Sequence, residues 1–96
     1  MKRQKLIRDK IPELFNINKT HIADDDEFYT ALVNKLQEEV DEFKSDKNVE
    51  ELADILEVVY AISDLMGTSI EQLENIRKEK AVKRGKFTKK IIWDKE

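Results

Sequence analysis

The scarcity of turn-forming residues constrains this chain more than any other feature of its sequence. Only two glycines and one proline occur in 96 residues, so few positions favour a reversal of the backbone. The intervening residues include many Leu, Glu, Lys and Ala, which favour helix. The sequence therefore predicts an all-α fold built from a few long helices.

Capping signals divide the chain into three predicted helices. Each begins with a residue whose side chain can cap the helix, followed three residues later by Glu or Gln, which is the pattern of a capping box. The predicted bounds are Asp24 to about Lys44, Asn48 to Gly67, and Ser69 to near Gly85. The residues after Gly85 are predicted to form an extended or irregular tail, with a short strand over 91–93.

Length and composition limit the class of protein. The 96 residues are enough for one domain with a single core, and its marginal stability would gain from oligomerisation. Cysteine is lacking, and no apolar run has the length of a membrane span. The basic opening MKRQKLIRDK is followed by neither an apolar stretch nor a cleavage site, so we predict no signal peptide. We expect a single cytoplasmic domain over 1–96.

The charges are segregated along the chain. Residues 11–76 hold 17 of the 21 acidic residues, whereas residues 77–90 hold eight basic residues and one acid. This layout can draw cations toward an acidic centre, or it can be a solvated surface. The basic segment could also be a nucleic-acid arm. Because the acidic middle would repel a polyanion, a nucleic-acid polymer is not an expected partner.

Helical periodicity places one carboxylate inside the apolar stripe of each of the first two helices. At about 100° per residue, Glu39 falls within the apolar face of the first helix and Glu51 within that of the second. Glu42 and Asp54 lie three residues away, on the borders of the two stripes. Each stripe thus carries an acid that burial would make costly unless it had a partner.

Four acids on facing stripes predict a bound cation. No cluster of lysines or arginines is expected on the same stripes, and His and Cys are lacking there. The carboxylate oxygens therefore favour a hard ion, Mg²⁺ or Mn²⁺. The alternative is that Glu39 and Glu51 lie at the stripe edges and extend to water. The only histidine, His21, falls in a loop-like stretch and is expected to be a surface residue.

The motifs resemble those of a known family. Residues 38–42, EEVDE, followed by 51–54, ELAD, are similar to the Glu-Glu-x-x-Glu and Glu-x-x-Asp motifs of the MazG-like, all-α nucleoside triphosphate pyrophosphatases. The opening KLIRDKIPE and the segment IRKEKAVKRGKF resemble a phosphoribosyl-ATP pyrophosphohydrolase-like subgroup of that family. The resemblance implies an all-α helical bundle whose core is completed by oligomerisation.

The resemblance also assigns roles to individual residues. It implies that Mg²⁺ is held by Glu39, Glu42, Glu51 and Asp54. It implies that Glu38 positions or deprotonates the attacking water. It places three basic residues of the third helix, with two weaker candidates near the N-terminus, around the substrate phosphates: Lys80, Lys83, Arg84, Arg8 and Lys10.

The function implied is Mg²⁺-dependent hydrolysis of a nucleoside triphosphate to monophosphate and pyrophosphate, with Mn²⁺ as a possible substitute. The expected partners are the nucleotide and further copies of the chain in a homodimer or higher homo-oligomer. Two alternatives stay open: a phosphoribosyl-ATP pyrophosphohydrolase of histidine biosynthesis, and a non-catalytic helical interaction module. The base and the sugar of the substrate are not predicted.

Overall fold

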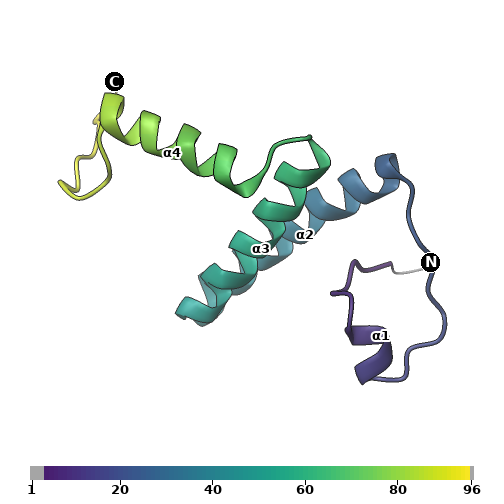
Figure 1. The fold of residues 1–96 in the computed structure, drawn as a ribbon. Coiled ribbons are helices and arrows are strands. Elements are labelled where there is room, and N and C mark those ends of the chain that lie inside the picture. The colour runs from purple at the N-terminus through teal and green to yellow at the C-terminus, as the bar shows by residue number, and fades with distance from the viewer. Residues whose placement is uncertain (1–3, 96) are drawn as a thin grey trace.

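The computed structural model describes residues 4–95, which form four helices and no strand (Figure 1). The helices are α1 Ile11–Leu14, α2 Asp25–Asp46, α3 Val49–Leu65 and α4 Ile70–Arg84. The prediction of an all-α fold is confirmed. Positions 1–3 and 96 of the predicted domain lie outside the described residues.

The side chains predicted to cap the three long helices do so. Asp24 and Asn48 each accept a hydrogen bond from the backbone N–H three residues further on, at 2.9 and 3.1 Å. Ser69 and Gln72 exchange both bonds of a capping box. These local contacts explain why the helix starts could be found in the sequence, since a cap depends only on residues within one turn.

The capping box predicted at Asp24 is only half formed. The Glu27 carboxylate does not return to the start of the helix but lies 2.8 Å from His21 Nε2. His21 is exposed, as predicted. The hydrogen bond between the Glu27 and His21 side chains thus replaces the second bond of the capping box.

Two segments differ from the prediction. The short helix α1 was not predicted; it has Pro12 in its first turn, where a missing N–H costs nothing. The predicted strand over 91–93 is not formed, because this tail runs without a neighbouring strand in the described chain and an isolated strand leaves its backbone groups unpaired.

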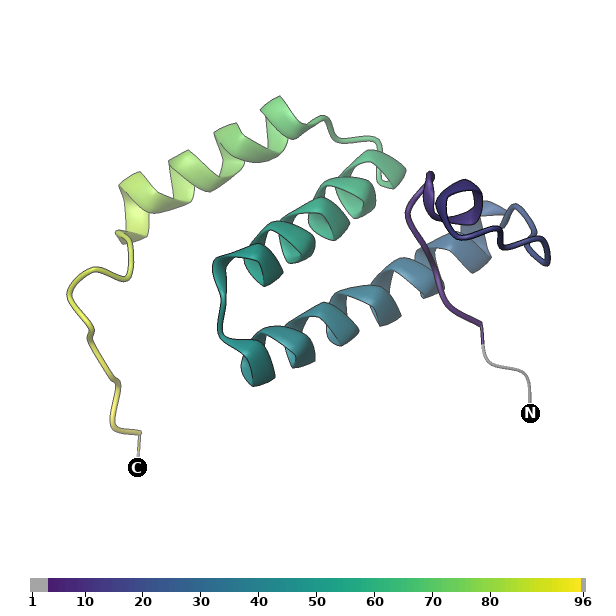
Figure 2. The same cartoon turned by 90° about the horizontal axis from the view of Figure 1, so that it is seen from below.

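The helices form an open zigzag. Lys47 and Asn48 join α2 and α3 into an antiparallel hairpin, with Lys47 in the left-handed conformation at φ 54°. Helix α4 contacts α3 but, within the described chain, does not contact α2 (Figure 2). The N-terminal segment and α1 border a groove whose other walls come from α2 and α3 (Figure 2). A single chain therefore does not close the bundle.

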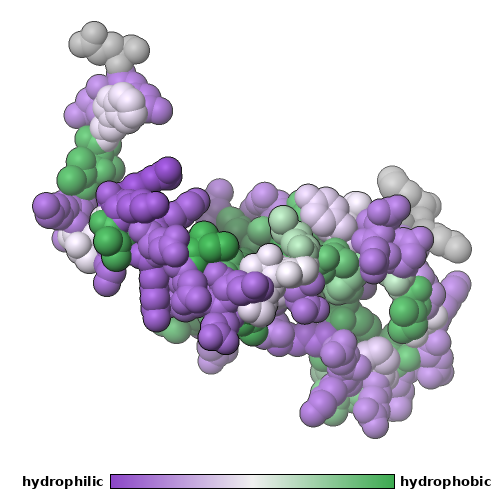
Figure 3. Space-filling view, turned by 45° about the horizontal axis from the view of Figure 1, so that its top comes forward, coloured by the Kyte–Doolittle hydropathy of each residue, from purple (hydrophilic) through white to green (hydrophobic). Residues whose placement is uncertain are grey.

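The core of one chain is small. Leu32 and Val58 are the buried apolar residues among those described. The accessible surface is 9303 Å², compared with about 5,700 Å² for a compact monomer of 11.3 kDa. Apolar side chains are accordingly open at the surface (Figure 3). Over residues 4–95, no helix combines the length and the apolar character needed to cross a bilayer.

Candidate metal centre

Carboxylates from the last turns of α2 and the first turns of α3 meet between the two helices, near the connection that joins them. One oxygen from each of Glu39, Glu51 and Asp54 lies within 4.8 Å of the others. Glu38, Glu39 and Glu42 form a second group by the same measure. Glu39 belongs to both groups. The structure thus brings the four predicted ligands into two overlapping groups, and no single group of described residues contains all four.

The two acids predicted to lie within the apolar stripes are withdrawn from water. Glu39 is only 6 % exposed, and its Oε2 has no hydrogen-bond partner. Glu51 is half-buried, and its Oε2 is likewise buried without a partner. The helical periodicity of the sequence predicts that both Glu39 and Glu51 lie within the apolar stripes. An unpaired buried carboxylate oxygen is unfavourable, so the pair favours a cation or a proton.

The electrostatics of the cluster raise the pKa of both acids. Burial, followed by repulsion from Glu42, Asp46 and Asp54, raises the pKa of Glu51 to about 7. Burial and repulsion from Glu42 also raise the pKa of Glu39, although Lys35 opposes this. These carboxyls therefore hold protons more firmly than ordinary glutamates, as expected of acids that are crowded together and withdrawn from water.

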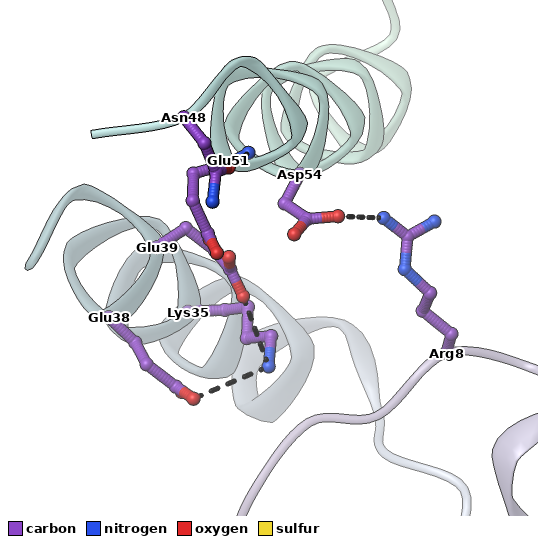
Figure 4. A network of polar contacts seen from close by, with 7 residues as sticks. All are labelled: Arg8, Lys35, Glu38, Glu39, Asn48, Glu51 and Asp54. Atoms are coloured by element: carbon purple, nitrogen blue, oxygen red, sulfur yellow. Dashed lines mark hydrogen bonds and ion pairs between the residues drawn. The ribbon is translucent and has the colours of Figure 1, made fainter. Parts of the chain in front are cut away.

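A single lysine lies in the cluster, although no cluster of basic residues shares the two stripes. Lys35 Nζ is 3.5 Å from Glu39 Oε1 and 3.6 Å from Glu38 Oε1 (Figure 4). The periodicity that located Glu39 could have found it, because Lys35 falls at about −20° from Phe28 on the wheel of α2, at the same border as Glu42. It supplies one positive charge between Glu38 and Glu39.

Glu38 differs from its neighbour Glu39. Its burial alone would raise its pKa, but hydrogen bonds and charge from Lys5 and Lys35 lower the pKa below the usual value. Lys5 Nζ lies 3.1 Å from Glu38 Oε1. Glu38 is therefore an ionised carboxylate at the border of the cluster.

Of the basic residues predicted to bind phosphate, Arg8 is the one that reaches the cluster. Its Nη2 donates to Asp54 Oδ1 at 2.8 Å (Figure 4). Lys10 is exposed on the same segment. Lys80, Lys83 and Arg84 are exposed near the end of α4, and this chain does not bring that helix to α2.

A groove of about 560 Å³ runs from the carboxylates toward α1. Its polar end contains Arg8, Lys35, Glu39 and Asp54. Its other walls are mainly apolar and come from the N-terminal segment, α1, α2 and α3: Leu6, Ile7, Ile11, Leu14, Phe28, Leu32, Val58 and Ala61. The groove thus combines a polar end, lined by side chains of both charges, with a mainly apolar remainder.

The donor set suits a hard divalent cation. Both groups offer carboxylate oxygens alone, which Mg²⁺ and Mn²⁺ prefer over soft ligands. The buried, unpartnered oxygens of Glu39 and Glu51 are the features that such an ion would satisfy.

No protein-family model, curated protein or solved structure matches the chain.

Proposed function

We propose that this protein is a Mg²⁺-dependent nucleoside triphosphate pyrophosphohydrolase of the MazG-like kind. The observation that carries the proposal is the buried Glu39, whose Oε2 has no hydrogen-bond partner and which lies beside Glu51 and Asp54, where a cation could be held. The other oxygen, Oε1, pairs with Lys35 at 3.5 Å, whereas most buried polar atoms have a partner of their own. The family motifs at 38–42 and 51–54 support the same assignment.

The carboxylates of the cluster would have different roles in such a reaction. Glu39, Glu51 and Asp54, with Glu42 at the edge, would hold Mg²⁺. The ion, when bound, supplies positive charge that stabilises the phosphate oxygens and acidifies a water ligand. Glu38, ionised and at the border, is suited to orient the attacking water or accept its proton.

The groove supports a nucleotide as substrate. A triphosphate could reach the carboxylates at the polar end while the base contacts apolar side chains such as Phe28 and Leu14. Phosphoryl transfer of this kind needs no covalent nucleophile, because positioning and charge stabilisation supply the catalysis. The chain has only Gly67 and Gly85 as glycines, so it cannot build a glycine-rich phosphate loop.

We propose further that the working form is a homo-oligomer. Each chain leaves about 3,500 Å² more surface exposed than a compact monomer would, which exceeds the roughly 800 Å² that a standard interface buries on each partner. A second copy would also be the source of Lys80, Lys83 and Arg84 for the phosphates, since α4 lies apart from α2 in its own chain.

The products of the reaction test the proposal. A panel of nucleoside triphosphates is incubated with the protein and Mg²⁺, and the products are separated by chromatography. We expect monophosphate and pyrophosphate in equal amounts, with turnover supported by Mn²⁺ and stopped by EDTA. Diphosphate and orthophosphate as primary products, or full turnover in EDTA, would overturn the proposal.

The exposed apolar side chains favour a second candidate, a non-catalytic helical interaction module. The two functions differ in what they require of Glu39. An interaction module gains nothing from an acid buried away from its surface, so its partner affinity would survive Glu39→Gln, whereas the hydrolase would lose activity.

A further inference from the structure

The contact between Arg8 and Asp54 joins segments that are 46 positions apart in the sequence. Arg8 belongs to the N-terminal segment, whereas Asp54 lies on α3 in the carboxylate cluster. In Figure 4, Arg8 approaches Asp54 from the side opposite Glu39 and Glu51. The guanidinium bonds to Oδ1 alone, so Asp54 keeps a second oxygen for another partner.

We infer that Arg8 is a positioning residue, which orients Asp54 toward the cation and thereby couples ordering of the segment 6–11 to cation binding. The inference rests on the metal site of the proposed function. Partners of metal-binding carboxylates fix the orientation of these ligands and raise metal affinity. Since coupling between two events is reciprocal, a bound cation must stabilise the Arg8 contact as much as the contact stabilises the cation.

The same contact shapes the groove. Residues 6–11 form one wall, and Arg8 is the member of this segment that is hydrogen-bonded to α3. Without the bond, the wall loses its hydrogen bond to α3, although the adjacent Lys5 still pairs with Glu38 on α2. Arg8 would therefore affect the binding of substrate as well as that of the cation.

Metal affinity tests the inference without relying on turnover. Mn²⁺ binding is measured by electron paramagnetic resonance for the full chain and for Arg8→Met, Arg8→Lys and Arg77→Met. Arg77 provides the matched control, because it pairs with Glu74 on α4, away from the cluster. We expect Arg8→Met to weaken Mn²⁺ binding about tenfold or more, Arg8→Lys to restore part of it, and Arg77→Met to leave it unchanged.

Hydrogen exchange of residues 6–11, with and without Mn²⁺, gives the reciprocal readout. We expect Mn²⁺ to slow exchange in the unmodified protein but not in Arg8→Met. Faster exchange with Mn²⁺, or tighter Mn²⁺ binding by Arg8→Met, would show that Arg8 competes with the ion and would overturn the inference. Equal affinity of Arg8→Met and the unmodified chain would overturn it as well, while leaving the proposed function intact. No Mn²⁺ binding by the unmodified chain would overturn both.

Discussion

At the scale of single residues, Glu39 and Glu51 hold carboxylate oxygens away from water without a hydrogen-bond partner. Burial and the neighbouring acids raise the pKa of both groups, and Lys35, which pairs with Glu39 and Glu38, opposes the shift at Glu39 only in part. In the absence of a cation, the charged form of these side chains therefore opposes folding. Substitution by glutamine, which keeps the shape of the side chain and removes its charge, is the simplest test of this balance.

Glu39→Gln and Glu51→Gln should abolish turnover and Mn²⁺ binding without unfolding the protein. The amide keeps the shape of the side chain and removes the charge that would hold the ion. Because the substitution relieves repulsion, we expect the melting temperature in EDTA to stay level or rise. Glu50→Gln, at an exposed position on α3, is the control and should retain activity. A large fall in melting temperature would instead indicate a purely structural role.

The raised pKa values predict a pH dependence of the apo protein. The pKa of Glu51 is about 7 in the folded state and 4.5 as the reference for the unfolded state. Between these values the folded state binds more protons, so the free energy of unfolding falls as pH rises. The stabilisation is complete below pH 4.5 and lost above about 7.

Urea unfolding in EDTA at pH 5 and pH 8 measures this dependence. We expect lower stability at pH 8, a smaller difference in Glu51→Gln, and recovery of stability at pH 8 when Mg²⁺ is added. Higher stability at pH 8 than at pH 5 in EDTA would contradict the burial of Glu51.

The sequence predicted some of these residues and not others, for physical reasons. Glu39 could be predicted because burial in a two-helix hairpin follows the helical period. Lys35 obeys the same period and was missed although the signal was present. The bond from Arg8 to Asp54 could not be predicted, since it depends on the path of the irregular residues between α1 and α2. No periodicity describes that path.

At the scale of elements, the start of α3 serves both folding and the site. Asn48 caps the helix, and Glu51 occupies the position from which a capping box would return to the cap. Its carboxylate is instead turned into the cluster (Figure 4). The cap therefore fixes the turn of helix that carries one of the two buried acids.

Asn48→Ala should destabilise the protein by about 1 kcal/mol through loss of the cap, and it should also weaken Mn²⁺ binding because the first turn of α3 loosens. Ser69→Ala provides the comparison, since it removes the corresponding cap of α4. It should show a similar loss in urea unfolding with unchanged Mn²⁺ affinity. If the two variants changed Mn²⁺ affinity equally, the role of Glu51 in Mn²⁺ binding would not depend on the Asn48 cap.

The elements themselves were predicted well where the signals were local. The three long helices begin within one residue of the predicted caps, because the caps act over a single turn. Helix α1 is too short to show a periodic pattern, and the course of α4 relative to α2 depends on packing that one chain does not supply.

At the scale of the whole molecule, the apolar surface is the dominant feature. The radius of gyration is 16.9 Å, against about 13 Å for a compact domain of this length. Part of the exposed apolar surface lies on the side of α3 turned away from the cluster and includes Val49, Leu52 and Leu56. If the working form is the proposed homo-oligomer, we expect this side to contact another copy.

Light scattering should find a dimer or larger homo-oligomer at micromolar concentration. Leu56→Glu should shift the protein toward monomer and reduce turnover, because a charge at a buried interface is costly. Lys44→Glu, at an exposed position on α2, should leave the mass unchanged. If the unmodified protein were monomeric and fully active, the working form would not be a homo-oligomer.

The short connection between α2 and α3 also has a kinetic consequence. The acids that meet in the cluster lie between positions 38 and 54, so their approach requires closure of only a small loop of chain. Local contacts of this kind form early, whereas distant ones wait for larger losses of chain entropy. The hairpin should therefore bring the acids together in a fast, concentration-independent phase. Joining of subunits should follow as a slower phase whose rate rises with protein concentration.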